Sequence, residues 1–121
     1  MKISELVKQA HETAKAKGWW EEKRTYLEIL ALIHSEISEA VECVREGMIE
    51  PTVETTEIFN GGSKVPQKIS KKPIGLPSEL ADVIIRIADF CGHEGIDLEA
   101  AIKAKMAYNK TRAYRHGGKA A

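Results

Sequence analysis

Side chains suited to helix packing recur at intervals of three and four residues through the segment 22–46 and just beyond it. The seam positions are Leu27, Leu30, His34, Ile37, Val41, Val44 and Met48. A helix brings residues at this spacing onto one side, whereas a half-buried strand would alternate with a period of two. The segment therefore predicts a long amphipathic helix whose seam packs in a bundle.

Three further segments have helical spacing, which gives four expected helices. Their expected ranges are 3–17, 22–46, 78–94 and 97–110. Gly18, Gly47 and Gly95 follow the first three as stop signals, while Ser78 and Asp97 precede the last two as N-caps. A length of 121 residues suits one domain. We therefore expect a single all-α domain, residues 1–121, with a four-helix bundle core.

The segment 51–77 differs in composition and separates the second and third expected helices. It holds all four prolines of the chain and the turn signal Asn60-Gly61-Gly62. A short β-hairpin with strands at 53–59 and 64–69 is one interpretation. Pro66 would restrict the second of these strands to a sheet edge. We treat the segment as a Pro/Gly-rich insertion in the bundle.

The overall composition excludes several classes of function. Apolar residues make up 43% of the chain and charged residues 30%, with a net charge of zero. A neutral chain is a poor nucleic-acid binder, and no apolar run approaches the length of a membrane span. The N-terminus does not resemble a signal peptide, and two cysteines form no disulfide framework. We expect a cytoplasmic protein without nucleic-acid or membrane partners.

Two close acidic pairs flank the apolar positions of the second and third helices. Glu36 and Glu39 are three residues apart, as are Glu79 and Asp82, so each pair leaves one face of its helix. If the two helices pack antiparallel, the pairs face each other and form an all-oxygen site. Such ligands favour Mg²⁺ or Mn²⁺ over zinc. The spacing alone leaves a second interpretation open, in which both pairs are solvated flanks.

The fourth expected helix carries a basic face near its end. Lys105, Asn109 and Arg112 follow at i, i+4 and i+7, and Arg115 lies just beyond them. A point charge, a neutral donor and a planar guanidinium fork together suit phosphate oxygens. The alternative is that these bases complement the helix dipole as a solvated tail.

Two tryptophans, Trp19 and Trp20, stand before the second expected helix. An indole at this place has two interpretations. It packs in the core or an interface, or it stacks on a nucleobase. We take Trp20 as the candidate for base stacking.

Taken together, Glu36-x-x-Glu39, Glu79-Leu-Ala-Asp82 and the Lys105-x-x-x-Asn109-x-x-Arg112 series with its RHGGK ending resemble one known family. This family is the MazG-like branch of the all-α nucleoside triphosphate pyrophosphohydrolases. The resemblance spans about residues 18–119 and is strengthened by the block ELADVIIRIADFCGHEGIDLEAAI. The segment 51–77 departs from the pattern, because it separates the acidic pairs by more than is usual in compact members.

The resemblance implies a helical bundle that assembles as a homodimer or homotetramer. It also implies a metal site in which Glu36, Glu39, Glu79 and Asp82 hold Mg²⁺, with Mn²⁺ as a substitute. The implied reaction cleaves a nucleoside triphosphate between its α and β phosphates, giving the monophosphate and pyrophosphate. Such a reaction clears noncanonical or surplus nucleotides from the nucleotide pool.

Within this reaction the residues have distinct expected roles. Glu36 or Glu39 is the candidate catalytic carboxylate that accepts a proton from the attacking water. The candidates for substrate binding are Lys105, Asn109, Arg112, Arg115 and Trp20.

Three alternatives remain from the sequence. A helical module that senses nucleotides without cutting them needs the same binding groups. A purely structural oligomer needs none of them. A related hydrolase acting on phosphoribosyl-linked nucleotides would use the same metal motif.

Overall fold

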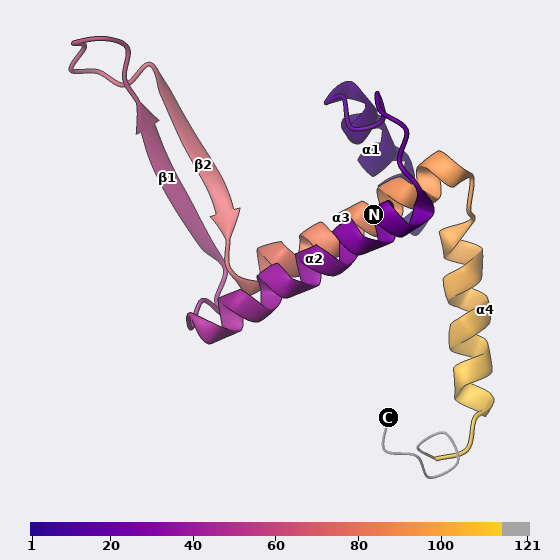
Figure 1. Cartoon of the computed structure of the whole chain (residues 1–121). Coiled ribbons are helices and arrows are strands. Elements are labelled where there is room, and N and C mark those ends of the chain that lie inside the picture. Colours follow the sequence, from indigo (N-terminus) through magenta and orange to yellow (C-terminus); the bar gives the residue numbers. More distant parts are fainter. Residues whose placement is uncertain (115–121) are drawn as a thin grey trace. The chain divides into compact units, whose positions relative to one another are not determined.

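The computed structural model describes residues 1–114, and this range contains four helices and two strands (Figure 1). In chain order the elements are α1 (Ile3–Ala16), α2 (Tyr26–Arg45), β1 (Thr52–Ile58), β2 (Lys68–Ile74), α3 (Leu76–Glu94) and α4 (Leu98–Thr111). The helices lie close to their expected ranges. The largest shift is at the start of α2, where the Thr25 hydroxyl accepts a hydrogen bond from the Glu28 backbone N–H and caps the helix. None of the helices in residues 1–114 has the length and apolar content needed to cross a lipid bilayer.

The prediction of an all-α fold is wrong, because β1 and β2 form a two-stranded antiparallel sheet. Its register runs from Thr52 paired with Ile74 to Ile58 paired with Lys68. The sequence TVETTEI of β1 is rich in β-branched residues, which fit a strand better than a helix. The hairpin interpretation placed the second strand at 64–69, but β2 begins only after Pro66 and ends at Ile74.

The chain divides into two compact units. Unit 1 comprises Met1–Glu22 and the chain from Ile87 onward, so it contains α1, α4 and the end of α3. Unit 2 comprises Lys23–Arg86, so it contains α2, the hairpin and the start of α3.

In unit 1, α1 packs against α4 and against the end of α3. A Cβ atom at Gly92 of α3 would lie 2.6 Å from the Cβ of His11 on α1, which is closer than side chains tolerate. The absence of a side chain at Gly92 therefore lets the two helices approach closely. Among residues 1–22 and 87–114 of this unit, the buried ones are Ala10, Ala88, Asp89 and Cys91.

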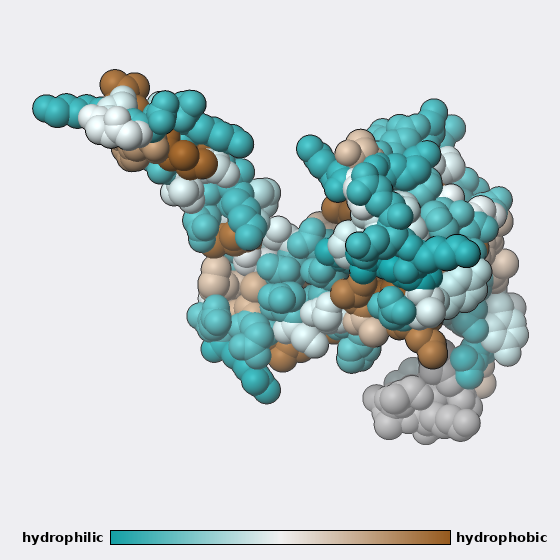
Figure 2. Space-filling view, turned by 45° about the horizontal axis from the view of Figure 1, so that its top comes forward, coloured by the Kyte–Doolittle hydropathy of each residue, from teal (hydrophilic) through white to brown (hydrophobic). Residues whose placement is uncertain are grey.

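In unit 2, α2 has two apolar faces, of which the chain covers one. Ile29, Ala40 and Cys43 are buried. Five of the six large apolar residues of the predicted seam are between 46% and 79% exposed, namely Leu27, Leu30, Ile37, Val41 and Val44, whereas Met48 is half-buried. Figure 2 shows hydrophobic side chains on the surface of the hairpin as well as on the helices. The bundle seam predicted from the spacing is thus a surface of this chain.

Both cysteines, Cys43 and Cys91, are free and buried. Burial raises the pKa of the Cys43 thiol and that of the Cys91 thiol. A raised pKa favours the protonated thiol, which is the less nucleophilic form.

The base of the hairpin is fastened to the end of α2 and the start of α3. The Leu76 backbone N–H donates to the Met48 carbonyl, and the Ser78 hydroxyl donates to the Pro73 carbonyl. Gly75, between β2 and α3, has a φ of +99° and faces the Glu50 carbonyl. These contacts bring the chain back beside the end of α2 after the hairpin.

We expect Gly75→Ala to destabilise the protein by about 1–3 kcal/mol, because it combines an unfavourable backbone conformation with a steric clash. A Cβ atom there would lie 2.5 Å from the Glu50 carbonyl oxygen. Gly61→Ala is the matched control, since no atom lies within 4 Å of a Cβ at Gly61. Urea unfolding followed by circular dichroism measures both variants. Equal stability of the two variants would contradict this account of the hairpin base.

Candidate metal centre

Three carboxylates of unit 2 converge between α2 and α3. Glu36 from α2 and Glu79 and Asp82 from α3 each offer one oxygen, and these oxygens lie within 4.8 Å of one another. Glu79 and Asp82 share a face because they are three residues apart in the first turns of α3. Glu36 and Glu79 are half-buried, whereas Asp82 is exposed. We call these three residues the acidic cluster.

Glu39, the fourth predicted ligand, does not belong to the acidic cluster. Its side chain is exposed, yet its charge is close enough to raise the pKa of Glu79. The structure therefore brings together three of the four predicted ligands and places the fourth beside them.

The acidic cluster carries an excess of negative charge that Arg86 and Lys72 only partly offset. Burial raises the pKa of Glu79 above its ordinary value, and the charges of Asp82, Glu39 and Glu36 raise it further. Lys72 of β2 acts in the opposite direction and lowers it. A divalent cation would relieve this repulsion, and three carboxylates are the hard oxygen donors that Mg²⁺ and Mn²⁺ prefer. The donor set thus fits the predicted cation.

Two basic residues without a predicted role, Arg86 and Lys72, lie close to the acidic cluster. Arg86 of α3 donates from Nε to Oε1 of Glu36 at 2.7 Å. The sequence did hold a signal for Arg86, because it follows Asp82 by four residues and so lies on the same face of the helix. Lys72 lies in the segment treated as an insertion, and nothing in its spacing pointed to Glu79.

The predicted phosphate-binding residues that the structure describes lie in unit 1. Lys105 and Asn109 belong to α4, whereas Arg112 follows the helix with an extended backbone, so helical spacing does not reach it. The Lys105 Nζ and Arg112 Cζ atoms lie 5.2 Å and 5.9 Å from the centre of the Tyr108 ring. The structure thus gathers the two cations around one aromatic ring. Arg115 lies outside the described residues.

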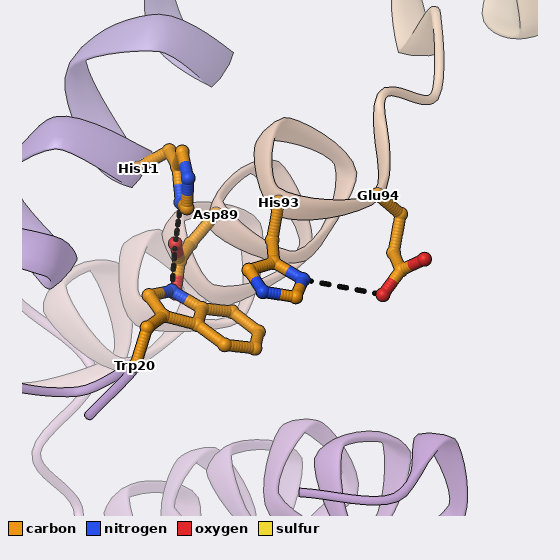
Figure 3. A network of polar contacts seen from close by, with 5 residues as sticks. All are labelled: His11, Trp20, Asp89, His93 and Glu94. Carbon is orange, nitrogen blue, oxygen red and sulfur yellow. Dashed lines mark hydrogen bonds and ion pairs between the residues drawn. The ribbon is translucent and has the colours of Figure 1, made fainter. Parts of the chain in front are cut away.

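Trp20, the candidate for base stacking, already has partners in unit 1 (Figure 3). Its indole N–H donates to Oδ1 of Asp89 at 2.8 Å, and its ring stacks on His93 with a centroid distance of 3.7 Å. The Nδ1 atom of His11 lies 2.9 Å from the same Asp89 oxygen. Asp89 is buried, so these contacts satisfy its carboxylate and join α1 to α3. One face of the Trp20 indole is therefore occupied by His93.

Comparison of the chain with known proteins matched no protein-family model, no curated protein and no solved structure. The resemblance to MazG-like enzymes therefore stays a prediction from the motifs.

We expect Glu79→Gln to stabilise the protein in EDTA at pH 7. A carboxyl group whose pKa is raised by folding opposes folding once it is ionised. The advantage of the variant should shrink as the pH falls through the raised pKa toward the ordinary value of about 4.3. Thermal unfolding at several pH values measures this difference, with Glu57→Gln on exposed β1 as the control.

Addition of Mg²⁺ should make the wild type more stable than Glu79→Gln, which reverses the order of stability expected in EDTA. The cation stabilises the wild type by binding its folded form, whereas the variant lacks one ligand. A variant that is less stable than the wild type in EDTA would contradict the described charge balance.

Proposed function

We propose that this protein is a Mg²⁺-dependent nucleoside triphosphate pyrophosphohydrolase that acts in the cytoplasm as a homo-oligomer. The observation that carries the proposal is the acidic cluster, whose three oxygens from α2 and α3 lie within 4.8 Å of one another. Carboxylates at this separation repel one another, and a cation bound between them turns this repulsion into attraction and stabilises the arrangement. Mn²⁺ would serve as a substitute ion.

The proposed chemistry assigns separate tasks to the acidic residues. Glu36, Glu79 and Asp82 hold the cation, which when bound supplies positive charge that offsets the developing charge on the phosphates. Glu39 lies beside the acidic cluster without belonging to it, so its carboxylate is the one we assign to accept the proton of the attacking water. The water attacks in line with the bond between the α and β phosphates.

Lys105, Asn109 and Arg112 are the residues we assign to the polyphosphate. Lysine and arginine supply positive charge, and the pair of cations near Tyr108 provides it at one place. The products are a nucleoside monophosphate and pyrophosphate, and their formation would remove surplus or noncanonical nucleotides from the pool.

Product analysis tests the reaction. The purified protein is incubated with Mg²⁺ and a panel of ribo- and deoxynucleoside triphosphates, and the products are separated by anion exchange. We expect monophosphate and pyrophosphate, with loss of both in EDTA and in the double variant Glu36→Gln, Glu79→Gln. Removal of two of three ligands should lower the rate by at least a hundredfold, since the cation stabilises the transition state.

Other outcomes of this experiment identify the alternatives. Diphosphate and orthophosphate would mean that another bond is cleaved. Nucleotide-dependent thermal stabilisation without any product would favour a sensing module. Turnover confined to phosphoribosyl-linked nucleotides would favour the related hydrolase class. Unchanged hydrolysis by the double variant would overturn the assignment of the cation site.

The exposed seam of α2 supports the proposed homo-oligomer. Its spacing of three and four residues is that of a helix packing against another helix. A contiguous row of exposed apolar side chains is costly in water and is typical of an interaction surface. We therefore assign this seam to contact with a second copy of the chain, in a dimer or a tetramer.

We expect Val41→Lys to dissociate this oligomer, because the variant places a charge in the middle of the seam. Ser35→Lys is the matched control, with the same added charge on a different, exposed face of α2. Size-exclusion chromatography with light scattering compares each mass with the 13.4 kDa of one chain. A monomeric wild type, or equal masses of the two variants, would refute the assignment of the seam.

A further inference from the structure

The ion pair between Arg86 and Glu36 joins the same two helices that form the acidic cluster. The distance of 2.7 Å from Nε to Oε1 is typical of a short, charge-assisted hydrogen bond. The Glu36 and Arg86 side chains are 16% and 34% exposed. The pair of Arg45 with Glu42, within α2, is different, because it is 3.3 Å long and its side chains are 74% and 56% exposed. Only the first of these two pairs is partly removed from water.

The ion pair and the acidic cluster exist together in one structure. While Glu36 accepts the hydrogen bond from Arg86, it still offers an oxygen within 4.8 Å of Glu79 and Asp82. A carboxylate has two oxygens and several lone pairs, so it can accept from an arginine and still bind a cation. The bond to Arg86 therefore does not remove Glu36 from the cluster.

Glu36 needs such a restraint more than the other two carboxylates. Glu79 and Asp82 are held near each other by their spacing on α3, whereas Glu36 reaches them from α2. Repulsion by two carboxylates would turn a flexible glutamate side chain away into water. A guanidinium on α3 opposes this rotation, because it attracts Glu36 toward the helix that carries the other two ligands.

We propose that Arg86 is a positioning residue that holds Glu36 in place as the cation ligand contributed by α2. This inference rests on the proposed function, since it assigns Arg86 to the same cation site. Groups that orient a metal ligand through a hydrogen bond commonly strengthen metal binding by about 10–100-fold.

The positive charge of Arg86 weakens cation binding, whereas its hydrogen bond to Glu36 strengthens it. These opposite effects on the affinity make the inference testable. A positive side chain near a cation site repels the cation, so its removal would by itself tighten binding. Water screens this repulsion because the guanidinium is partly exposed, and the charge of Glu36 balances it. If Arg86 positions Glu36, its removal weakens binding. If Arg86 is only a competing counter-charge, its removal strengthens binding.

The experiment is a titration with Mn²⁺ in the absence of nucleotide, followed by electron paramagnetic resonance of the free ion. Arg86→Met retains an unbranched apolar stem and removes both the charge and the hydrogen bond. Arg86→Lys retains the charge and one donor. Arg45→Met is the matched control, since it breaks an arginine–glutamate pair outside the acidic cluster.

We expect Arg86→Met to raise the dissociation constant for Mn²⁺ by about tenfold or more. Arg86→Lys should recover part of this loss, and Arg45→Met should bind like the wild type. An unchanged or lower dissociation constant for Arg86→Met overturns the inference. So does a wild-type protein that binds no Mn²⁺.

Thermal unfolding in EDTA separates positioning from a merely structural role. If Arg86→Met lowers the melting temperature but leaves Mn²⁺ affinity unchanged, the pair only joins α2 to α3 and the inference is overturned. The titration needs no turnover, so its result is separable from that of the product analysis. Mn²⁺ binding that depends on Arg86, without any nucleotide product, would refute the proposed reaction and support the role of Arg86.

Discussion

The repulsion among the carboxylates of the acidic cluster is the constraint on which the organisation of unit 2 depends. Two unit charges about 4 Å apart repel by roughly 1 kcal/mol in bulk water and roughly 4 kcal/mol at a protein surface. Glu79 is half-buried and has a raised pKa, so water screens this repulsion less than it would between fully exposed carboxylates. Arg86 and Lys72 offset only part of it. The approach of α2 to α3 is therefore opposed at this place, and a cation bound there would relieve the repulsion.

The two apolar faces of α2 differ in exposure and in the size of their side chains. Ile29, Ala40 and Cys43 form the buried side of the helix. These residues are mostly small, so they allow close approach but remove little apolar surface from water. The large side chains lie on the exposed seam, where a helix of another chain would bury more area. On α2, small apolar residues are thus buried within the chain, and large ones lie on its surface. This distribution is expected if contact with another chain supplies part of the stability of unit 2.

Much of the helical content was predictable, because spacing and capping residues are local features of the sequence. The acidic pairs were predictable for the same reason, since i, i+3 geometry fixes Glu79 beside Asp82. The contact of Arg86 with Glu36 was not, because it depends on how two helices are rotated about their axes. Trp20 is a similar case: its stacking on His93 joins residues far apart in sequence. The first strand was predicted to within one residue, but the second was placed too early in the sequence. The Asn-Gly-Gly signal indicated a tight turn, whereas residues 59–67 form a longer connection.

The hairpin base explains how an insertion is compatible with a precise acidic cluster. The Leu76 N–H donates to the Met48 carbonyl, so the chain leaves α2 and enters α3 at neighbouring points, as it would in a short helix–helix connection. Gly75 permits the approach of the two backbones that this bond requires. The length and sequence of the hairpin beyond its base are then free to differ without displacing Glu79 from Glu36. Lys72 is the exception, because it lies close enough to the base to act on Glu79. The base of the hairpin therefore belongs with the acidic cluster, whereas its distal end is independent of it.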